Sequence, residues 1–276
     1  YNSVGKVDDS SEVSAVSLAE KFADRFTDKT VQTDTSYTSS DIAISVNKVS
    51  DGNTVYYVAD IYTSDITAFQ TYLADDTYGT GFSETELDMD AETNAILTVN
   101  GDSYSYDQNT DNGTVIRNGV VYRTADTDSD VCVLYYDGTM KTYSGSDFNA
   151  QDAINNGAYQ AWTFGPSLLD DNGNAKTSFN TSSYINGTHP RTAIGYYEPG
   201  HYVFVTVDGR QEDSAGMTLE DLSALFAKLG CKAAYNLDGG HCSFMTFNDS
   251  IVNSPSNGSN SKMSDCLLIA EPSAAK

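Results

Sequence analysis

Short apolar runs alternate with turn residues through the first half of the chain. Between residues 41 and 143 these runs are rich in β-branched and aromatic side chains, which is typical of strands. The polar loops between them include Ser50–Asn53, Asn118-Gly119 and Asp137-Gly138, which are typical of hairpin turns. The pattern predicts a meander of short antiparallel strands.

The second half combines strands with one well-marked helix. Apolar runs over residues 202–207 and 233–237 flank a segment with helical spacing of its apolar positions. Thr218 suits the N-cap of this helix and Gly230 its C-terminal stop. This is a β-α-β unit over residues 202–237. Together with the meander it predicts an α+β fold of curved, mostly antiparallel sheets with a few helices.

The N-terminal part differs in character. Residues 1–38 are polar, with Ser, Thr and Asp prominent, apart from apolar positions at helical spacing from Val16 to Phe26. We expect a linker or a short N-terminal helix over residues 1–38, and the main domain over residues 39–276.

The charge balance limits the possible partners. The 276 residues carry 39 acidic and 15 basic side chains, for a net charge of −24. Nucleic acid is not an expected partner, because phosphate contacts need a basic surface. No apolar run is long enough to span a bilayer, so membrane insertion is not expected either. The abundance of Ser, Thr, Asn, Asp and Tyr suggests a secreted or cell-surface protein whose signal peptide has been removed.

The cysteines do not form a metal motif. Cys132, Cys231, Cys242 and Cys266 include no CxxC pair, so a zinc knuckle is not expected. The even count fits one or two disulfides as well as buried free thiols. The sequence indicates no required cofactor. Acidic turns could hold Ca²⁺ through oxygen ligands, but no ligand spacing points to a particular metal site.

Two aspartates are the main candidates for catalysis. Asp208 follows the strand over 202–207, and Asp238 follows the strand over 233–237 and begins an Asp-Gly-Gly turn. If the helix joins two parallel strands, both aspartates lie at the same edge of the sheet. Crevices at such edges commonly bind ligands. We therefore expect Asp208 and Asp238 to line one pocket.

Other polar residues near strand ends are candidates for binding. Arginine suits phosphate because its planar fork donates two hydrogen bonds together. Backbone N–H groups at consecutive glycines can form an anion-binding nest, and histidine titrates near neutral pH. The candidate binding residues are Asn100, Asp102, Arg191, Thr192, Arg210, Asn236, Gly239, Gly240, His241 and Ser243.

The ordered set of motifs resembles the phosphodiester glycosidase family. The matching segments run through roughly residues 40–272 and are Ala95–Asp102, Val115–Arg123, Phe164–Leu168, His189–Gly195, Val205–Arg210, Gly216–Leu219, Leu229–Met245 and Ile251–Ser256. The chain departs from the family pattern at His241, where a small residue is usual. It also has Lys262 as the nearest base where an arginine is expected, which removes bidentate phosphate binding at that point.

The resemblance implies a hydrolase that cleaves a sugar-1-phosphodiester at the C1–O bond, in an extracellular or cell-envelope glycan. It implies that Asp208 and Asp238 serve as nucleophile or base. It also implies that Arg191, Arg210 and the amides of Gly239-Gly240 bind phosphate, and that Asn100, Thr192 and Asn236 hold sugar hydroxyls. The alternatives are a non-catalytic carbohydrate-binding or cell-wall-binding module of the same fold, and a phosphodiesterase that cleaves the P–O bond.

Overall fold

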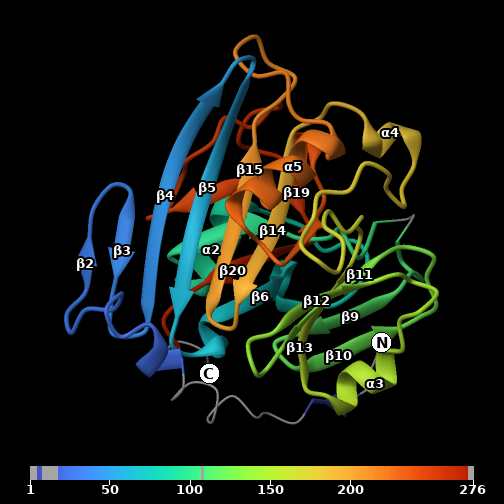
Figure 1. Cartoon of the computed structure of the whole chain (residues 1–276), viewed down its shortest axis with the longest axis horizontal. Coiled ribbons are helices and arrows are strands. Elements are labelled where there is room, and N and C mark those ends of the chain that lie inside the picture. Colours follow the sequence, from blue (N-terminus) through green and yellow to red (C-terminus); the bar gives the residue numbers. More distant parts are fainter. Residues whose placement is uncertain (1–4, 8–17, 107–108, 273–276) are drawn as a thin grey trace.

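The computed structural model describes residues 5–7, 18–106 and 109–272 (Figure 1). Within these residues a seven-stranded sheet has the order β16 (Ala233–Asn236), β14 (Arg191–Glu198), β15 (His201–Val207), β5 (Thr54–Thr63), β4 (Ile42–Asp51), β3 (Ser36–Thr38) and β2 (Val31–Gln32). A six-stranded sheet has the order β1 (Gly5–Lys6), β10 (Val120–Thr124), β9 (Thr114–Arg117), β13 (Ala158–Thr163), β11 (Val131–Tyr135) and β12 (Met140–Tyr143).

The structure also contains a five-stranded sheet and a separate pair of short strands. The sheet has the order β18 (Ser250–Ile251), β17 (Met245–Phe247), β8 (Leu97–Asn100), β20 (Asp265–Ile269) and β6 (Phe69–Leu73). The pair consists of β19 (Lys262–Met263) and β7 (Glu84–Thr85). Neighbouring strands in the described parts of all these sheets run antiparallel.

The helices are short and lie outside the sheets. Besides the helical residues 18–21, the described helices are α2 (Glu86–Thr93), α3 (Ala150–Asn155), α4 (Ser183–Asn186) and α5 (Leu219–Leu229), with 3₁₀ turns η1 (Ile66–Ala68), η2 (Ala74–Asp76) and η3 (Gly240–Cys242). Helix α5 begins as predicted, because Thr218 accepts a hydrogen bond from the Asp221 amide, and it ends at Gly230 in the left-handed conformation. The predicted α+β class, with mostly antiparallel sheets and few helices, is confirmed.

The predicted hairpins form. β4 and β5 pair along their whole length and turn at Asp51–Thr54. β9 and β10 turn at Asn118 and Gly119, which have φ of 51° and 79°. These two left-handed residues suit the twist of a two-residue hairpin.

The β-α-β unit separates two parts of the core. Val203, Val205 and Val207 face α5 and pack in one buried cluster with Leu222 and Phe226. Tyr202 and Phe204 point to the opposite face of β15, into the largest cluster, which also contains strands of the other two large sheets. β15 and β16 both pair antiparallel with β14, which lies between them, so they run parallel to each other.

The N-terminal segment contributes to the sheets, which differs from the expected linker. β1 pairs with β10, and Val7 beside it is 3% exposed. β2 and β3 extend the seven-stranded sheet, so residue 38 does not separate a linker from the domain. Residues 18–21 are helical, with Leu18 buried; Val16, the first residue of the predicted helix, lies outside the described residues.

All four cysteines are buried free thiols. Among the described residues, no helix is long and apolar enough to cross a bilayer.

Candidate active site

Three strands bring the predicted residues to one edge of the seven-stranded sheet. Asp208 follows β15 and Asp238 lies two residues beyond β16. Arg191 is the first residue of β14, the strand between them, and pairs with Val207. Because β14 is antiparallel to both neighbours, its N-terminal end meets their C-terminal ends. Asp208 and Asp238 thus follow parallel strands at the same edge of the sheet, as expected.

A cavity of about 200 Å³ lies at this edge and is called the basic cavity here. It is lined by seven of the predicted residues, namely Arg191, Arg210, Asn236, Asp238, Gly239, Gly240 and His241, together with Phe164, Tyr184, Ile185, His189, Pro190 and Leu237. The other predicted residues, Asn100, Asp102, Thr192, Asp208 and Ser243, are not among its lining residues.

Asp238 is the only carboxylate lining the basic cavity within the described chain. Its Oδ2 accepts a hydrogen bond from the hydroxyl of Ser103, and its Oδ1 accepts one from the amide of Gly239 at 2.9 Å. Burial raises the pKa of this carboxyl above its ordinary value, although these two hydrogen bonds, a third from Cys242 and the nearby His241 act in the opposite direction. The result is a half-buried carboxylate whose orientation is fixed by two donors.

Ser103 was not predicted as a site residue. It follows β8 in the left-handed conformation, with φ of 54°. This conformation is uncommon for residues other than glycine, asparagine and aspartate. The only local signal was the polar turn Asn100-Gly101-Asp102, and nothing in it indicates a contact with a residue 135 positions away.

Asn100 and Thr192 hold the backbone of Asp238 through two hydrogen bonds in series. The Asn100 amide donates from Nδ2 to the main-chain oxygen of Asp238 at 2.7 Å. Thr192 donates from Oγ1 to Oδ1 of Asn100 at 2.6 Å. Both side chains are buried and engaged, so the structure gives them a positioning role and does not bring them to the cavity as sugar ligands.

Arg191 is a buried cation that faces the basic cavity. It is 3% exposed and donates from Nε to the Met217 carbonyl at 3.0 Å and from Nη2 to the Gly187 carbonyl. None of the ion pairs among the described residues includes Arg191. Burial, followed by the positive charge of Arg210, lowers the pKa of Arg191 to about 10. A bound anion would offset both effects.

Arg210 reaches the same cavity from the turn after β15. Its Nη2 donates to the Tyr184 hydroxyl at 3.2 Å and lies 3.1 Å from Nδ1 of His189. Nε2 of His189 is 2.6 Å from the Tyr184 carbonyl. The carbonyl can only accept, so Nε2 carries the proton and Nδ1 accepts from Arg210. The neutral tautomer of His189 thus orients the guanidinium.

The double glycine has a different role from the expected anion nest. The Gly239 amide donates to Asp238, and the Gly240 amide donates to the Pro190 carbonyl at 3.1 Å. A Cβ on Gly239 would lie 2.6 Å from that same carbonyl oxygen. Gly239 is required for the close approach of two chain segments, and Gly240 has a left-handed φ of 64°. The N–H groups of both glycines are already used.

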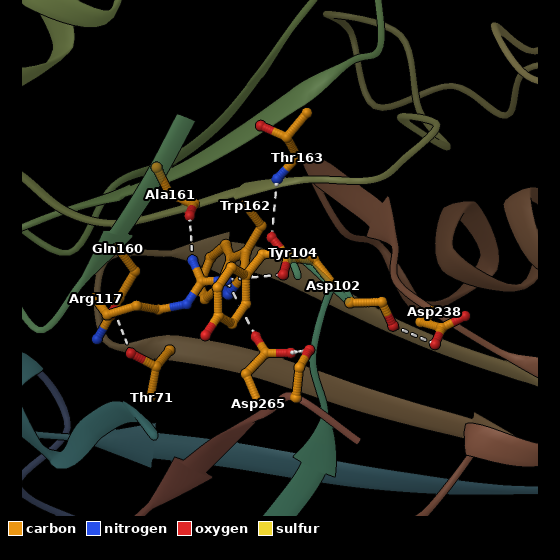
Figure 2. Close-up of polar contacts among 12 residues, drawn as sticks. Thr71, Asp102, Tyr104, Arg117, Gln160, Ala161, Trp162, Thr163, Asp238 and Asp265 are labelled. Atoms are coloured by element: carbon orange, nitrogen blue, oxygen red, sulfur yellow. Dashed lines mark hydrogen bonds and ion pairs between the residues drawn. The ribbon is translucent and has the colours of Figure 1, made fainter. Parts of the chain in front are cut away.

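Asp102 is part of a buried ion network, shown in Figure 2. Nη2 of Arg117 donates to Asp102 at 2.8 Å and to Asp265 at 3.1 Å. The second oxygen of Asp102 accepts from the Thr163 amide. Burial, then the adjacent Asp102, raises the pKa of Asp265 to about 7. The network joins strands of two sheets and holds the turn that carries Ser103.

Asp208 lies beside the cavity and holds a neighbouring loop. It is 4% exposed and accepts hydrogen bonds from Nδ2 of Asn253 at 3.1 Å and from the Ser254 amide at 3.0 Å. Burial raises its pKa to about 6. Asn253 also donates to the Ser243 carbonyl, which links Asp208 to the turn after Asp238.

Two polar atoms near the site have no hydrogen-bond partner within the described parts of the chain. They are Oδ1 of Asn236, which lines the basic cavity, and Oγ of Ser243. His241 is exposed at the cavity rim. The described residues contain no group of three or more His, Cys, Asp or Glu side chains that could hold a metal ion.

The chain is similar to several known proteins. The model of the phosphodiester glycosidase family matches residues 93–270. An uncharacterised protein from the SPbeta prophage of Bacillus subtilis, YomE, is 34% identical over 203 residues, which are 71% of this chain and 31% of the relative. The chain thus spans about a third of that relative's length.

Solved structures share the fold. The catalytic domain of zebrafish N-acetylglucosamine-1-phosphodiester alpha-N-acetylglucosaminidase, auto-inhibited by its pro-peptide, superposes with a TM-score of 0.64 at 20% identity, covering 83% of each chain. A hypothetical protein from Synechocystis gives 0.63 at 12% identity, covering 84% of this chain and 62% of that one. The family match extends over most of the chain and contains Asp238, Arg191 and Ser103. This chain belongs to the phosphodiester glycosidase family.

Proposed function

We propose that this chain hydrolyses the C1–O bond of a sugar-1-phosphodiester in an extracellular or cell-envelope glycan. The observation that carries the proposal is the pairing of one carboxylate, Asp238, with two arginines, Arg191 and Arg210, in a single cavity. The buried Arg191 has no ion-pair partner among the described residues, and such a cation is costly unless an anion joins it.

The chemistry of the leaving group fits this set of residues. Cleavage at C1 releases a phosphate monoester, whose second pKa is about 6, so it departs without full protonation. The demand on a general acid is therefore smaller than for an ordinary glycoside. The arginines bind the phosphate and stabilise the charge that develops on it as the C1–O bond breaks.

Asp238 acts on the other side of the bond. Its carboxylate stabilises the positive charge that develops at C1, as a nucleophile or as the base for the attacking water. The water oxygen ends on C1 and the bonding electrons leave with the phosphate oxygen. Ser103 and Gly239 keep the carboxylate oriented for this role.

Asp208 is the second carboxylate of the proposal. Its contacts with Asn253 and Ser254 favour a positioning role, in which it holds the loop beside the turn that carries Asp238. A direct catalytic role is the alternative. The split between kcat and KM in Asp208→Asn separates the two, because a carboxylate that acts only in the transition state lowers kcat and kcat/KM together.

The test is product analysis in isotopically labelled water with a panel of hexose and N-acetylhexosamine 1-(methyl phosphodiesters). The proposal expects label in the sugar. Label in the phosphate would instead identify a phosphodiesterase. Binding without turnover of any substrate in the panel would favour the carbohydrate-binding module.

A further inference from the structure

A second, larger cavity adjoins the basic cavity. Its volume is about 870 Å³, against about 200 Å³ for the basic cavity. The two share Asp238, Phe164, Tyr184 and Ile185 as lining residues, so they meet at the candidate catalytic carboxylate. We call the larger one the aromatic cavity, because the rings of Phe82, Phe164, Tyr106 and Tyr184 line it.

The described walls of the aromatic cavity carry almost no charge. Among the described residues that line it, Asp238 is the one ionisable acid or base apart from the tyrosine hydroxyls, and the other walls present side chains such as Thr80, Ser83 and Ser105. This is unusual in a chain with a net charge of −24. A ligand for this cavity is therefore neutral, in contrast to the anion expected among the arginines.

Its rim exposes aromatic rings. The exposed large apolar side chains among the described residues are Val31, Leu87, Tyr106 and Tyr184, and the two tyrosines both line this cavity. Tyr184 is 68% exposed and Tyr106 is 40% exposed. Exposed rings with hydroxyl groups offer an apolar face together with hydrogen-bonding edges. Sugar rings present the complementary combination of C–H faces and hydroxyl edges.

We propose that the aromatic cavity binds a neutral oligosaccharide, so that the natural substrate carries at least two sugar rings on the C1 side of the phosphodiester. This inference rests on the proposed function. With phosphate among the arginines and C1 beside Asp238, the sugar extends away from the basic cavity into the aromatic one. The volume lies in the upper part of the range of about 300–1,000 Å³ that is typical for drug-sized ligands, and a single hexose is smaller than those.

The hydroxyl-bearing walls distinguish an oligosaccharide from a lipid. An acyl chain leaves the hydroxyls of Thr80 and Ser83 without a partner, whereas sugar hydroxyls can bond to them. The experiment therefore includes a long-chain alkyl phosphodiester as a competitor. Competition by this probe, with none from a neutral oligosaccharide, would overturn the proposal.

The main experiment compares substrates of increasing length. The hexose accepted as a monosaccharide 1-(methyl phosphodiester) is extended to the matching disaccharide, and kcat/KM is measured for both. We expect an increase of about tenfold or more, which corresponds to about 1.4 kcal/mol of additional binding. Equal kcat/KM for the two substrates would refute the extended subsite while leaving the proposed hydrolysis intact.

A substitution locates the effect. Thr80 is exposed on the wall of the aromatic cavity and does not line the basic cavity. In Thr80→Trp the bulky ring obstructs the aromatic cavity. The gain in kcat/KM from the monosaccharide to the disaccharide substrate should therefore disappear, while the monosaccharide substrate is still hydrolysed. Thr35→Trp, at another exposed position, is the matched control and should retain the gain. An unchanged gain in Thr80→Trp would place the second ring elsewhere and contradict the proposal.

A binding measurement separates failure of this inference from failure of the proposed function. If no phosphodiester is hydrolysed, the proposed function fails. Calorimetry with the neutral disaccharides of the same panel then tests binding to the aromatic cavity independently of hydrolysis. Binding that Thr80→Trp abolishes and Thr35→Trp preserves would support the oligosaccharide site. Absence of binding to every member would overturn it.

Discussion

The hydroxyl of Ser103 donates a hydrogen bond to Oδ2 of Asp238 and so connects the turn after β8 with the turn after β16. The two turns belong to different sheets. The hydrogen bond favours the ionised carboxylate, because Oδ2 no longer accepts from the Ser103 hydroxyl once it is protonated. The charge state and the orientation of Asp238 thus depend on a residue from another part of the chain.

Ser103→Ala should shift the acid limb of the pH profile. Ser103 lowers the pKa of Asp238, so its removal raises that pKa, and the ionised carboxylate is lost at a higher pH than in the wild type. We expect kcat to fall about tenfold or more, since a hydrogen bond to a charged group contributes about 1.5–3 kcal/mol. The measurements are kcat and kcat/KM from pH 4 to 8. Ser146→Ala, at an exposed position, is the control. An acid limb at the wild-type position would separate Ser103 from the chemistry.

Asp238→Asn should remove activity and preserve the fold. Asn is nearly isosteric and can still accept from the Gly239 amide, but it cannot act as nucleophile or base. The expected loss of kcat is about 10²–10⁴-fold, the usual contribution of a positioned acid or base. Sugar release and the melting temperature are measured together. Turnover close to that of the wild type would exclude Asp238 as a catalytic residue.

Arg191→Lys should raise KM for phosphodiester substrates. Lysine keeps the positive charge but loses the planar fork, and it cannot also donate to both the Met217 and Gly187 carbonyls. A rise in KM of about tenfold corresponds to about 1.4 kcal/mol of lost binding. The matched control is Arg25→Lys, because the Arg25 guanidinium lies over the ring of Tyr62 in the seven-stranded sheet. An unchanged KM in Arg191→Lys would show that the phosphate lies elsewhere.

Glu86→Gln should change the pH dependence of stability. Glu86 in α2 is fully buried, and burial raises its pKa well above the ordinary value of 4.5. The folded state therefore binds a proton that the unfolded state releases above about pH 4.5, and each further pH unit costs the folded state about 1.4 kcal/mol until the folded pKa is reached. Below the unfolded pKa this cost is absent.

The variant removes the titration, so its free energy of unfolding relative to the wild type should increase from pH 5 to pH 8. Urea unfolding at several pH values measures this difference. Glu92→Gln, on the exposed face of the same helix, should leave the wild-type pH dependence unchanged. Parallel pH curves for Glu86→Gln and the wild type would contradict the interpretation.

The ends of strands could be predicted from the sequence because the residues that mark them are neighbours along the chain. The apolar runs and the Thr218 and Gly230 caps defined the β-α-β unit, and its geometry predicted that Asp208 and Asp238 lie at one edge of the sheet. The expectation that both line one pocket does not hold for the basic cavity, which Asp238 lines and Asp208 does not. Contacts between distant segments could not be found in this way. Nothing near Arg117 in the sequence indicates its partner Asp265, which lies 148 residues away.

The same limit explains the expectations that differ from the structure. Consecutive glycines permit an exposed nest and a close chain approach equally well, and only the position of Pro190 shows that Gly239 serves the second. Asp102 has the polar context of a ligand, yet its partner Arg117 removes it from the cavity. Strand β1 is two residues long and polar, so its pairing with β10 has no signature in the sequence.

The wall of the basic cavity and the rim of the aromatic cavity differ in how freely they can evolve. The turn that carries Ser103 is tied through Asp102 to the buried Arg117, and a change at any of these positions disturbs an ion network as well as the carboxylate. Thr80 and Ser83 of the aromatic cavity are exposed and do not line the basic cavity. Substitutions at these two positions can therefore change which glycan is accepted while the residues around Asp238 stay the same.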